Sequence, residues 1–206
     1  MEDLKKMKIK LLISTALCIG VFTGICFAGI ADKVPVDFFT TKYDSIIRKE
    51  TKRCFSVGMD YRWLKSQVAA ESNFNPNAVS PVGARGLAQF MKPTFNDVVK
   101  RSGYIQDDIF NPRWNLAAQA WYNRRLYNNW SAKRTELSRI QLMLCSYNSG
   151  LKYPLIAQKI CITKAEKSCN EWQDIRKFAS EVPGWIHEES LNYTKKISSF
   201  MGYREN

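Results

Sequence analysis

The chain has 206 residues, of which 45% are hydrophobic and 13% aromatic, a composition that excludes a disordered chain and suits one globular domain. Its formal net charge of +12 attracts polyanions such as nucleic acid, anionic membrane or acidic cell-wall polymer. The sequence lacks zinc-ligand spacings and aromatic RNA-binding segments, so we do not expect a nucleic-acid partner, and with His187 as the single histidine we predict neither a metal site nor a cofactor.

Residues 1–31 have the pattern of an export segment. Basic residues from Lys5 to Lys10 precede an uncharged run from Leu11 to Ala31 that ends in small residues. The run is long for a cleaved signal peptide and just long enough to span a bilayer, so a cleaved signal peptide and an uncleaved signal anchor both remain open. In either case we expect residues 32–206 to be exported to the periplasm or cell envelope, free of the inner membrane or anchored in it.

The exported part is predicted to be mainly α-helical, because apolar residues recur at three- and four-residue intervals and strand signals are sparse. Asp60 is an expected N-cap, Asn111–Pro112 is an expected helix start, and Gly103 is an expected helix end. The segment 75–86 is rich in Gly, Pro and Asn and is predicted to be a long loop. The predicted helices cover residues 35–52, 60–72, 93–103, 111–127, 135–147 and 187–200.

The cysteines outside the leader are even in number, which suggests disulfides in an exported protein. We expect the local pair Cys161–Cys169 to form. Cys54 and Cys145 are then left as a second pair, and two unpaired buried thiols are an equally open alternative for them.

The helix 60–72 places an acid on its apolar face. Leu64, Val68 and Glu71 are spaced at i, i+4 and i+7, so they share one stripe. A carboxyl group buried there either pairs with a cation or has its pKa raised by desolvation, and a raised pKa is what a general acid needs. A Glu at a frayed helix end in solvent is the alternative, and periodicity alone favours it.

The residues that follow Glu71 favour the buried acid over the solvated helix end. The segment from Glu71 to Gln89 has a Glu-Ser pair that closes a helix, then Ser, Gly-Ala and Gly-Leu-Ala-Gln. Further motifs are Asn-Pro-Arg-Trp-Asn-Leu at 111–116, Ser-Tyr-Asn-Ser-Gly at 146–150 and Glu-Ser-Leu-Asn-Tyr at 189–193. In this order they resemble the signature of the soluble lytic transglycosylase family.

The resemblance implies a lysozyme-like single catalytic domain with a groove for peptidoglycan glycan strands. It also implies cleavage of the β-1,4 bond between N-acetylmuramic acid and N-acetylglucosamine, with formation of a 1,6-anhydro ring. Glu71 would protonate the glycosidic oxygen and then take the proton of the C6 hydroxyl. A second carboxylate, which ordinary glycosidases use, is then not required.

The same resemblance assigns the remaining site residues. Tyr193 would hydrogen-bond Glu71, while Tyr147 shares a helix face with expected core positions and could instead only pack in the core. The substrate-binding residues implied are Ser80, Gln89, Met91, Tyr147, Asn148, Glu189 and Tyr193.

Other functions remain open at this level. A hydrolytic muramidase would use water in place of the C6 hydroxyl. An inactive glycan-binding component of a secretion machine is a further alternative. The biological setting, whether a phage endolysin, a wall-remodelling enzyme or a secretion-associated enzyme, is not fixed by the sequence, and we expect a monomer.

Overall fold

The computed structural model describes residues 35–55, 58–165 and 168–204, so the predicted export segment 1–31 lies outside the described residues. The expected mainly α-helical fold is confirmed, and β-structure in the described ranges is limited to two isolated bridges near residues 79–90. No helix in these ranges is long and apolar enough to cross a membrane. The elements are η2 (Val36–Phe38), α2 (Asp44–Phe55), α3 (Arg62–Ser72), α4 (Lys92–Ser102), α5 (Pro112–Asn129), α6 (Glu136–Ser149), α7 (Lys152–Ala165), α8 (Trp172–Ile175), η3 (Arg176–Glu181) and α9 (His187–Phe200).

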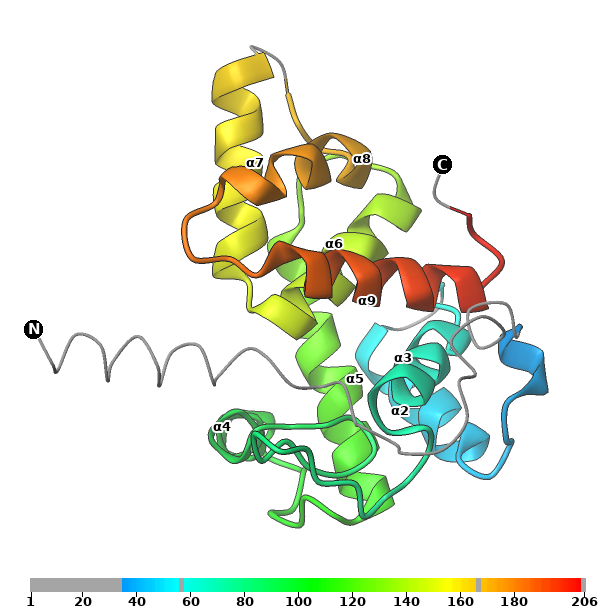
Figure 1. Ribbon diagram of the computed structural model, residues 1–206. Helices are drawn as coiled ribbons and strands as arrows, with labels where there is room; N and C mark the ends of the chain where they lie inside the picture. The colour runs from blue at the N-terminus through cyan, green and yellow to red at the C-terminus, as the bar shows by residue number, and fades with distance from the viewer. Residues whose placement is uncertain (1–34, 56–57, 166–167, 205–206) are drawn as a thin grey trace, which may run out of the picture.

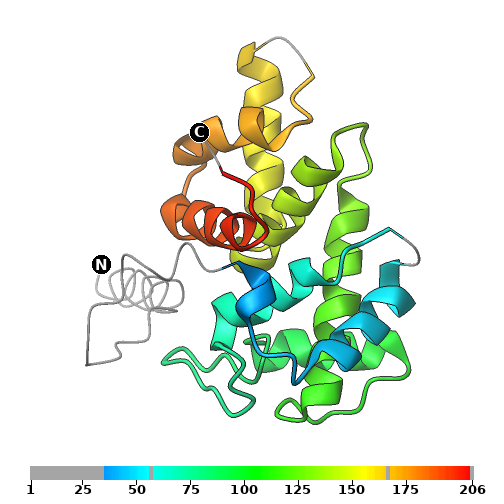
Figure 2. The same cartoon turned by 90° about the vertical axis from the view of Figure 1, so that its right-hand side faces the viewer.

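The helices form two groups on either side of α9. One group holds α2, α3 and α4 around α5, and the other holds α7, α8 and η3 (Figure 1). Helix α6 contacts α5, α7 and α9, and so joins the two groups. In the view turned by 90°, α7 again stands on the far side of α9 from α2 (Figure 2). The C-terminal end of α3 thereby meets α9, where the two groups adjoin.

Helix ends follow the local sequence. The side chain of Asn111 accepts a hydrogen bond from the backbone N–H of Arg113 and caps α5, while Thr135 caps α6 through Ser138 N–H. Helix α4 stops at Gly103, whose φ of 72° is left-handed and favours glycine. Helix α9 begins and ends at the predicted residues.

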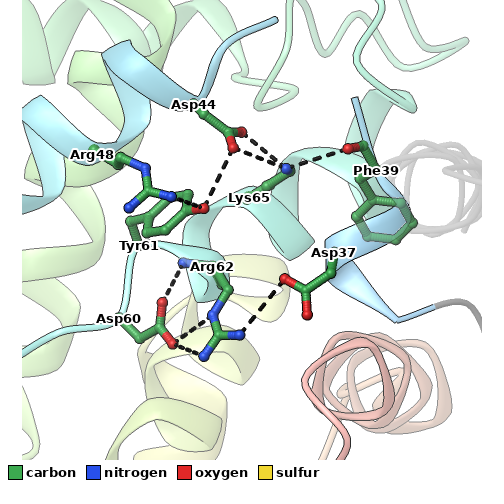
Figure 3. Close-up of polar contacts among 8 residues, drawn as sticks. All are labelled: Asp37, Phe39, Asp44, Arg48, Asp60, Tyr61, Arg62 and Lys65. Carbon is green, nitrogen blue, oxygen red and sulfur yellow. Dashed lines mark hydrogen bonds and ion pairs between the residues drawn. The ribbon is translucent and has the colours of Figure 1, made fainter. Parts of the chain in front are cut away.

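The predicted single helix over 35–52 is wrong. The chain makes the short turn η2, becomes extended at Phe39, and starts α2 only at Asp44. The carboxylate of Asp44 pairs with the buried ammonium of Lys65 on α3 at 3.0 Å, and Lys65 also donates to the carbonyl oxygen of Phe39 at 3.4 Å (Figure 3). Since a buried ammonium must be paired, this contact holds the segment before α2 in a non-helical path against α3.

The N-terminal end of α3 is fixed a second time by Asp60. Its Oδ1 accepts the backbone N–H of Arg62 at 2.9 Å, and its Oδ2 pairs with the Arg62 guanidinium at 2.7 Å (Figure 3). Asp60 therefore accepts an N–H of the first turn, but the N-cap of α3 is Tyr61, one residue after the predicted position. These contacts hold α3 at the end opposite to Glu71.

The group formed by α7, α8 and η3 was not predicted. The expected disulfide between Cys161 and Cys169 is present and ties α7 to the chain before α8. The second pairing does not form, because the two cysteines lie in different parts of the core. Cys54 on α2 contacts the hydroxyl of Tyr104 at 3.9 Å, whereas Cys145 is fully buried on α6, where desolvation raises the pKa of its thiol to about 12.

Candidate active site

Glu71 lies in the last turn of α3 and faces a cavity of about 210 Å³. The walls come from the loop after α3, from α4 and α5, from the end of α6 and the start of α7, and from the segment 184–190 that leads into α9. Asn73 and Phe74, directly after α3, both have positive φ, so the backbone turns sharply away from the helix at this point. The cavity therefore opens at the end of α3, with Glu71 in its wall.

The carboxyl group of Glu71 is held in its protonated form near neutral pH. Desolvation by the surrounding protein raises its pKa to about 8, the negative charge of Glu189 adds to the rise, and a hydrogen bond from Tyr193 opposes it. Glu71 is only partly exposed, so the alternative of a frayed, solvated helix end is wrong. A proton held at this pH is available for transfer to a bound substrate.

Tyr193 of α9 contacts Glu71 directly. Its hydroxyl donates to Glu71 Oε1 at 2.5 Å and accepts from Gln67 Nε2 at 3.0 Å. A donor at this position stabilises the carboxylate that forms when Glu71 gives up its proton. The structure thus brings together the two side chains that the resemblance paired.

Gln89 presents a hydrogen-bond acceptor to the cavity, because both protons of its side-chain amide are already used. Its Nε2 donates to the carbonyl oxygens of Ala78 at 3.2 Å and Gly86 at 2.9 Å, which uses both amide protons. The backbone has a φ of 47°, a left-handed conformation that aims the side chain back across the loop. Gln89 lines the cavity, and its Oε1 is left as a hydrogen-bond acceptor. Met91, 43% exposed, lines the cavity near its rim.

Tyr147 serves both the core and the cavity. Its ring packs edge-on against the rings of Phe90 and Tyr122 at interplanar angles of 67° and 68°, and its hydroxyl donates to the carbonyl oxygen of Ala88 at 2.8 Å. The same residue lines the cavity beside Asn148. Both interpretations of Tyr147, as a packing residue and as a site residue, therefore describe its position.

Asn148 is oriented by a chain of hydrogen bonds. The indole N–H of Trp185 donates to Ser190 Oγ at 3.3 Å, and Ser190 Oγ donates to Asn148 Oδ1 at 2.8 Å. Because an indole N–H is only a donor, the serine proton is directed to the amide oxygen of Asn148. The NH₂ group of Asn148 therefore remains to donate into the cavity.

Glu189 is a second carboxyl group in the cavity wall. It lines the same space as Glu71, and its charge is among the causes of the raised Glu71 pKa. Two acids that follow Glu71 in the sequence are paired with cations and do not line the cavity: Asp97 pairs with Arg101 at 2.6 Å, and Asp107 pairs with Lys92 at 2.6 Å. Glu189 therefore both lines the cavity, as the resemblance implied, and raises the pKa of Glu71.

The loop that carries Gln89 is locked to the start of α5. Buried Asn115 accepts the backbone N–H of Ala88 at 2.8 Å and donates to the carbonyl oxygen of Ile109 at 2.7 Å. Gly86 lies so close that a Cβ there would meet Asn115 Nδ2 at 2.4 Å, and its φ of 75° also favours glycine. This packing explains why Asn115 stands in the Asn-Pro-x-x-Asn motif.

Ser80 does not reach the cavity. Its hydroxyl accepts the backbone N–H of Ala84 at 3.0 Å, and its own backbone N–H donates to the carbonyl oxygen of Ala84 at 2.9 Å. It closes the tight turn through Gly83. Ser80 therefore shapes the loop and is not among the residues that line the cavity, and its sugar-binding role stays a prediction from the resemblance.

Comparison with known proteins identifies the family. The transglycosylase SLT domain family matches residues 52–167. The chain belongs to the transglycosylase SLT family. This SLT domain is 29% identical over 119 residues to membrane-bound lytic murein transglycosylase F of Shewanella oneidensis, covering 58% of the chain and 23% of that protein. For the protein of the same name from Serratia proteamaculans the identity is 28% over 151 residues, covering 72% and 29%.

Solved structures agree on the fold. The SLT domain superposes on the lytic transglycosylase Slt of Pseudomonas aeruginosa with a TM-score of 0.62 at 19% identity, covering 79% of the chain and 24% of that structure. For the 70 kDa soluble lytic transglycosylase of Escherichia coli the TM-score is 0.61 at 18% identity, covering 80% and 24%. The chain spans about a quarter of the length of these relatives.

Several cavity residues of the SLT domain were missed from the sequence. Tyr153 of α7 stacks on Trp185 at 5.9 Å between ring centroids, and both line the cavity with Tyr122. Gln67, one turn before Glu71, is also part of the site through Tyr193. A polar residue beside the apolar stripe of α3 was the available signal for Gln67, whereas Tyr153 lies on α7, a helix that the sequence pattern did not indicate, and Trp185 lies in the non-helical segment before α9.

Proposed function

We propose that this protein is a peptidoglycan lytic transglycosylase that cleaves the β-1,4 bond between N-acetylmuramic acid and N-acetylglucosamine and leaves a 1,6-anhydro ring. The observation that carries the proposal is Glu71, a carboxyl group with a pKa of about 8 in a cavity wall, with a tyrosine donor on one oxygen. Membership of the SLT family and relatives named lytic murein transglycosylase support the choice of substrate.

The proposed reaction uses Glu71 twice. It first gives its proton to the glycosidic oxygen, and the bond from that oxygen to C1 of the muramic residue breaks. The carboxylate, stabilised by the Tyr193 hydroxyl, then accepts the proton of the C6 hydroxyl as its oxygen bonds to C1. Water is not consumed, and Glu71 ends protonated as it began.

The polar groups around Glu71 suit a sugar with an N-acetyl group. The NH₂ of Asn148 can donate to an acetamido carbonyl, and Gln89 Oε1 can accept from a sugar hydroxyl or amide N–H. Met91 and Tyr147 supply apolar surface beside them. In this proposal Asn148 orients the acetamido group so that it stabilises the positive charge that develops at C1.

Hydrolysis is the second candidate, because Glu189 shares the cavity with Glu71. Paired carboxyl groups across a glycan groove are the usual arrangement for activating water. The two reactions differ in product: hydrolysis leaves a reducing muramic end, whereas transglycosylation leaves an anhydro end that lacks one water.

Mass analysis of muropeptides released from purified sacculi tests the proposal. We expect anhydro ends from the wild type, none from Glu71→Gln, and anhydro ends at a reduced rate from Glu189→Gln. Release of reducing muramic ends alone would overturn the transglycosylase proposal. Loss of those ends in Glu189→Gln would then assign Glu189 as the base that activates water.

We further propose that residues 1–31 direct export and that 32–206 form the catalytic domain at the cell envelope as a monomer. The basic and apolar pattern of the leader and the disulfide Cys161–Cys169 support export. The name of the relatives, membrane-bound lytic murein transglycosylase F, is consistent with an envelope location. The mass of the mature N-terminus distinguishes a cleaved signal from an anchor, and retention in the cytoplasm would contradict export.

A further inference from the structure

Behind Tyr193 lies a buried chain of amide groups that the mechanism above does not use. Gln67 is fully buried on α3, and its Nε2 is 3.0 Å from the Tyr193 hydroxyl. Its Oε1 accepts from Asn123 Nδ2 at 2.6 Å and from Gln119 Nε2 at 3.0 Å, both on α5. The chain thus runs from the middle of α5, through α3 and α9, to the carboxyl group of Glu71.

The direction of every hydrogen bond in this chain is fixed at its far end. Gln119 Nε2 also donates to the backbone carbonyl oxygen of Leu64 at 3.0 Å, and a carbonyl oxygen can only accept. The amide nitrogen of Gln119 therefore faces α3, and it presents its second proton to Gln67 Oε1. With its oxygen facing these donors, Gln67 must turn its NH₂ toward Tyr193.

This orientation determines where the Tyr193 proton goes. The phenol oxygen accepts from Gln67 on one side, so its single proton is donated on the other side, to Glu71 Oε1. A protonated Glu71 then carries its own proton on Oε2. That oxygen does not contact Tyr193, and its proton is the one available to a glycosidic oxygen.

We propose that Gln67 is a positioning residue that makes Tyr193 an obligatory donor to Glu71, with Gln119 and Asn123 as the anchor of that orientation. The inference rests on the proposed function, since it concerns how the acid is prepared. Without Gln67 the Tyr193 hydroxyl can rotate its proton away from Glu71. The protonated carboxyl group of Glu71 can then donate its hydrogen bond to the phenol oxygen, where the proton is not available to a glycosidic oxygen. The carboxylate that develops during bond cleavage also loses a fixed donor.

A double-mutant cycle on the full chain tests this role. Tyr193→Phe removes the donor and is expected to slow muropeptide release from sacculi on the order of 100-fold, the scale of a lost preorganised donor. Gln67→Met keeps the volume, removes the amide, and is expected to cost about tenfold. In the Tyr193→Phe background we expect Gln67→Met to cost less than about twofold, because its effect passes through the phenol.

A merely structural role predicts a different pattern. Multiplicative losses in the double variant would overturn the proposal. The matched control is Ser66→Ala, which removes a fully buried α3 hydroxyl that has no hydrogen-bond partner among the described residues and should leave the rate unchanged. If Gln67→Met does not fold, Gln119→Met replaces it, with the same expected dependence on Tyr193.

The product of cleavage tests the proposed function, and the cleavage rates of the variants test the positioning role of Gln67. Reducing ends in place of anhydro ends would remove the proposed function, yet coupling between Gln67 and Tyr193 would still be measurable in the rate of cleavage. Anhydro ends with additive losses would retain the function and remove the positioning role.

A pH–rate profile adds a second readout. Loss of the donor should raise the pKa of Glu71, so the fall in rate at alkaline pH should move to higher pH in both single variants.

Discussion

At the scale of single residues, Glu71 makes the folded state less stable above neutral pH. Its pKa is about 8 in the folded protein and near the ordinary value of 4.5 when unfolded. Below 4.5 both states hold the proton, and between the two values the unfolded state loses it first. The free energy of unfolding therefore falls as the pH rises from 4.5 to 8.

We therefore expect Glu71→Gln to be more stable than the wild type at pH 8 and equal to it near pH 4. Each pKa unit corresponds to roughly 1.4 kcal/mol, and because Glu71 is partly exposed we expect a gain of about 1–3 kcal/mol. Denaturant unfolding at both pH values measures it. An equal difference at the two pH values would show that desolvation of the carboxylate is not the cause.

Glu189 provides a second prediction at this scale. Its negative charge raises the pKa of Glu71, so Glu189→Gln should lower that pKa and move the alkaline fall in activity to lower pH. The wild-type rate should fall above about pH 8. The control is Glu188→Gln, an exposed neighbour that does not line the cavity. Equal shifts in both variants would mean that the charge acts through general electrostatics.

The sequence indicated Glu71 more clearly than its surroundings. Helical spacing placed Glu71 on the buried stripe, and the motifs named Gln89, Tyr147 and Asn148, all of which line the cavity. Gln67 was missed because its partners lie 52 to 126 residues away along the chain. Such contacts depend on how helices pack, which the pattern within one helix does not contain.

At the scale of elements, the loop 75–91 packs on the start of α5 through Asn115. Gly86→Ala would push a methyl group into Asn115 and Ile109 and also strain a backbone with φ of 75°. We expect a loss of about 3 kcal/mol of stability and of most activity, because Gln89 moves with the loop. Thermal unfolding and muropeptide release measure the two losses.

Gly83→Ala is the matched control for that prediction. Its φ of 88° is also left-handed, but an added Cβ there meets nothing within 4 Å. Gly83→Ala should lose only the stability that a Cβ costs in a left-handed backbone, roughly 1 kcal/mol, and should leave activity nearly intact. Similar losses in the two variants would show that close packing on Asn115 is not what matters.

Helices with strong end signals were predicted well, and those without them were not. Helix α5 has an Asn cap and an early Pro, and its start is correct. Helix α7 exposes Leu155 and Ile162, so its apolar residues do not form a single stripe. Its position depends on packing against α6 and η3, and on the disulfide, which only the folded chain brings together.

The disulfide gives a prediction for α7. Cys161 and Cys169 close a short loop, so their bond should add about 2–3 kcal/mol to the stability of the folded chain. Reducing agent should lower the unfolding temperature of the wild type but not of the Cys161→Ser, Cys169→Ser double variant. A fall in both proteins would instead point to a thiol effect elsewhere, with Cys54 as the more accessible of the two free cysteines.

At the scale of the whole molecule, charge and chemistry are separated in space. The chain carries a net charge of +12, yet among the described residues the cavity around Glu71 is lined by no lysine or arginine. The excess positive charge therefore lies outside the cavity wall and acts mainly on the approach of the protein to its substrate, while Lys196 nearby lowers the pKa of Glu71. Binding and chemistry should then depend differently on salt.

Binding of Glu71→Gln to sacculi should weaken several-fold as salt rises, because the range of electrostatic attraction shrinks from about 30 Å at 0.01 M to about 8 Å at 0.15 M. Sedimentation of the variant with sacculi measures this without cleavage of the polymer. Chitin beads, which present neutral N-acetylglucosamine chains, are the matched surface, and binding to them should change little. The rate of wild-type cleavage at saturating sacculi should change less with salt than binding does, because the cavity around Glu71 is lined by no lysine or arginine whose charge salt would screen. An equal loss on both polymers would show that salt acts on the fold or on the groove, and that the basic surface does not recruit the protein to an anionic wall.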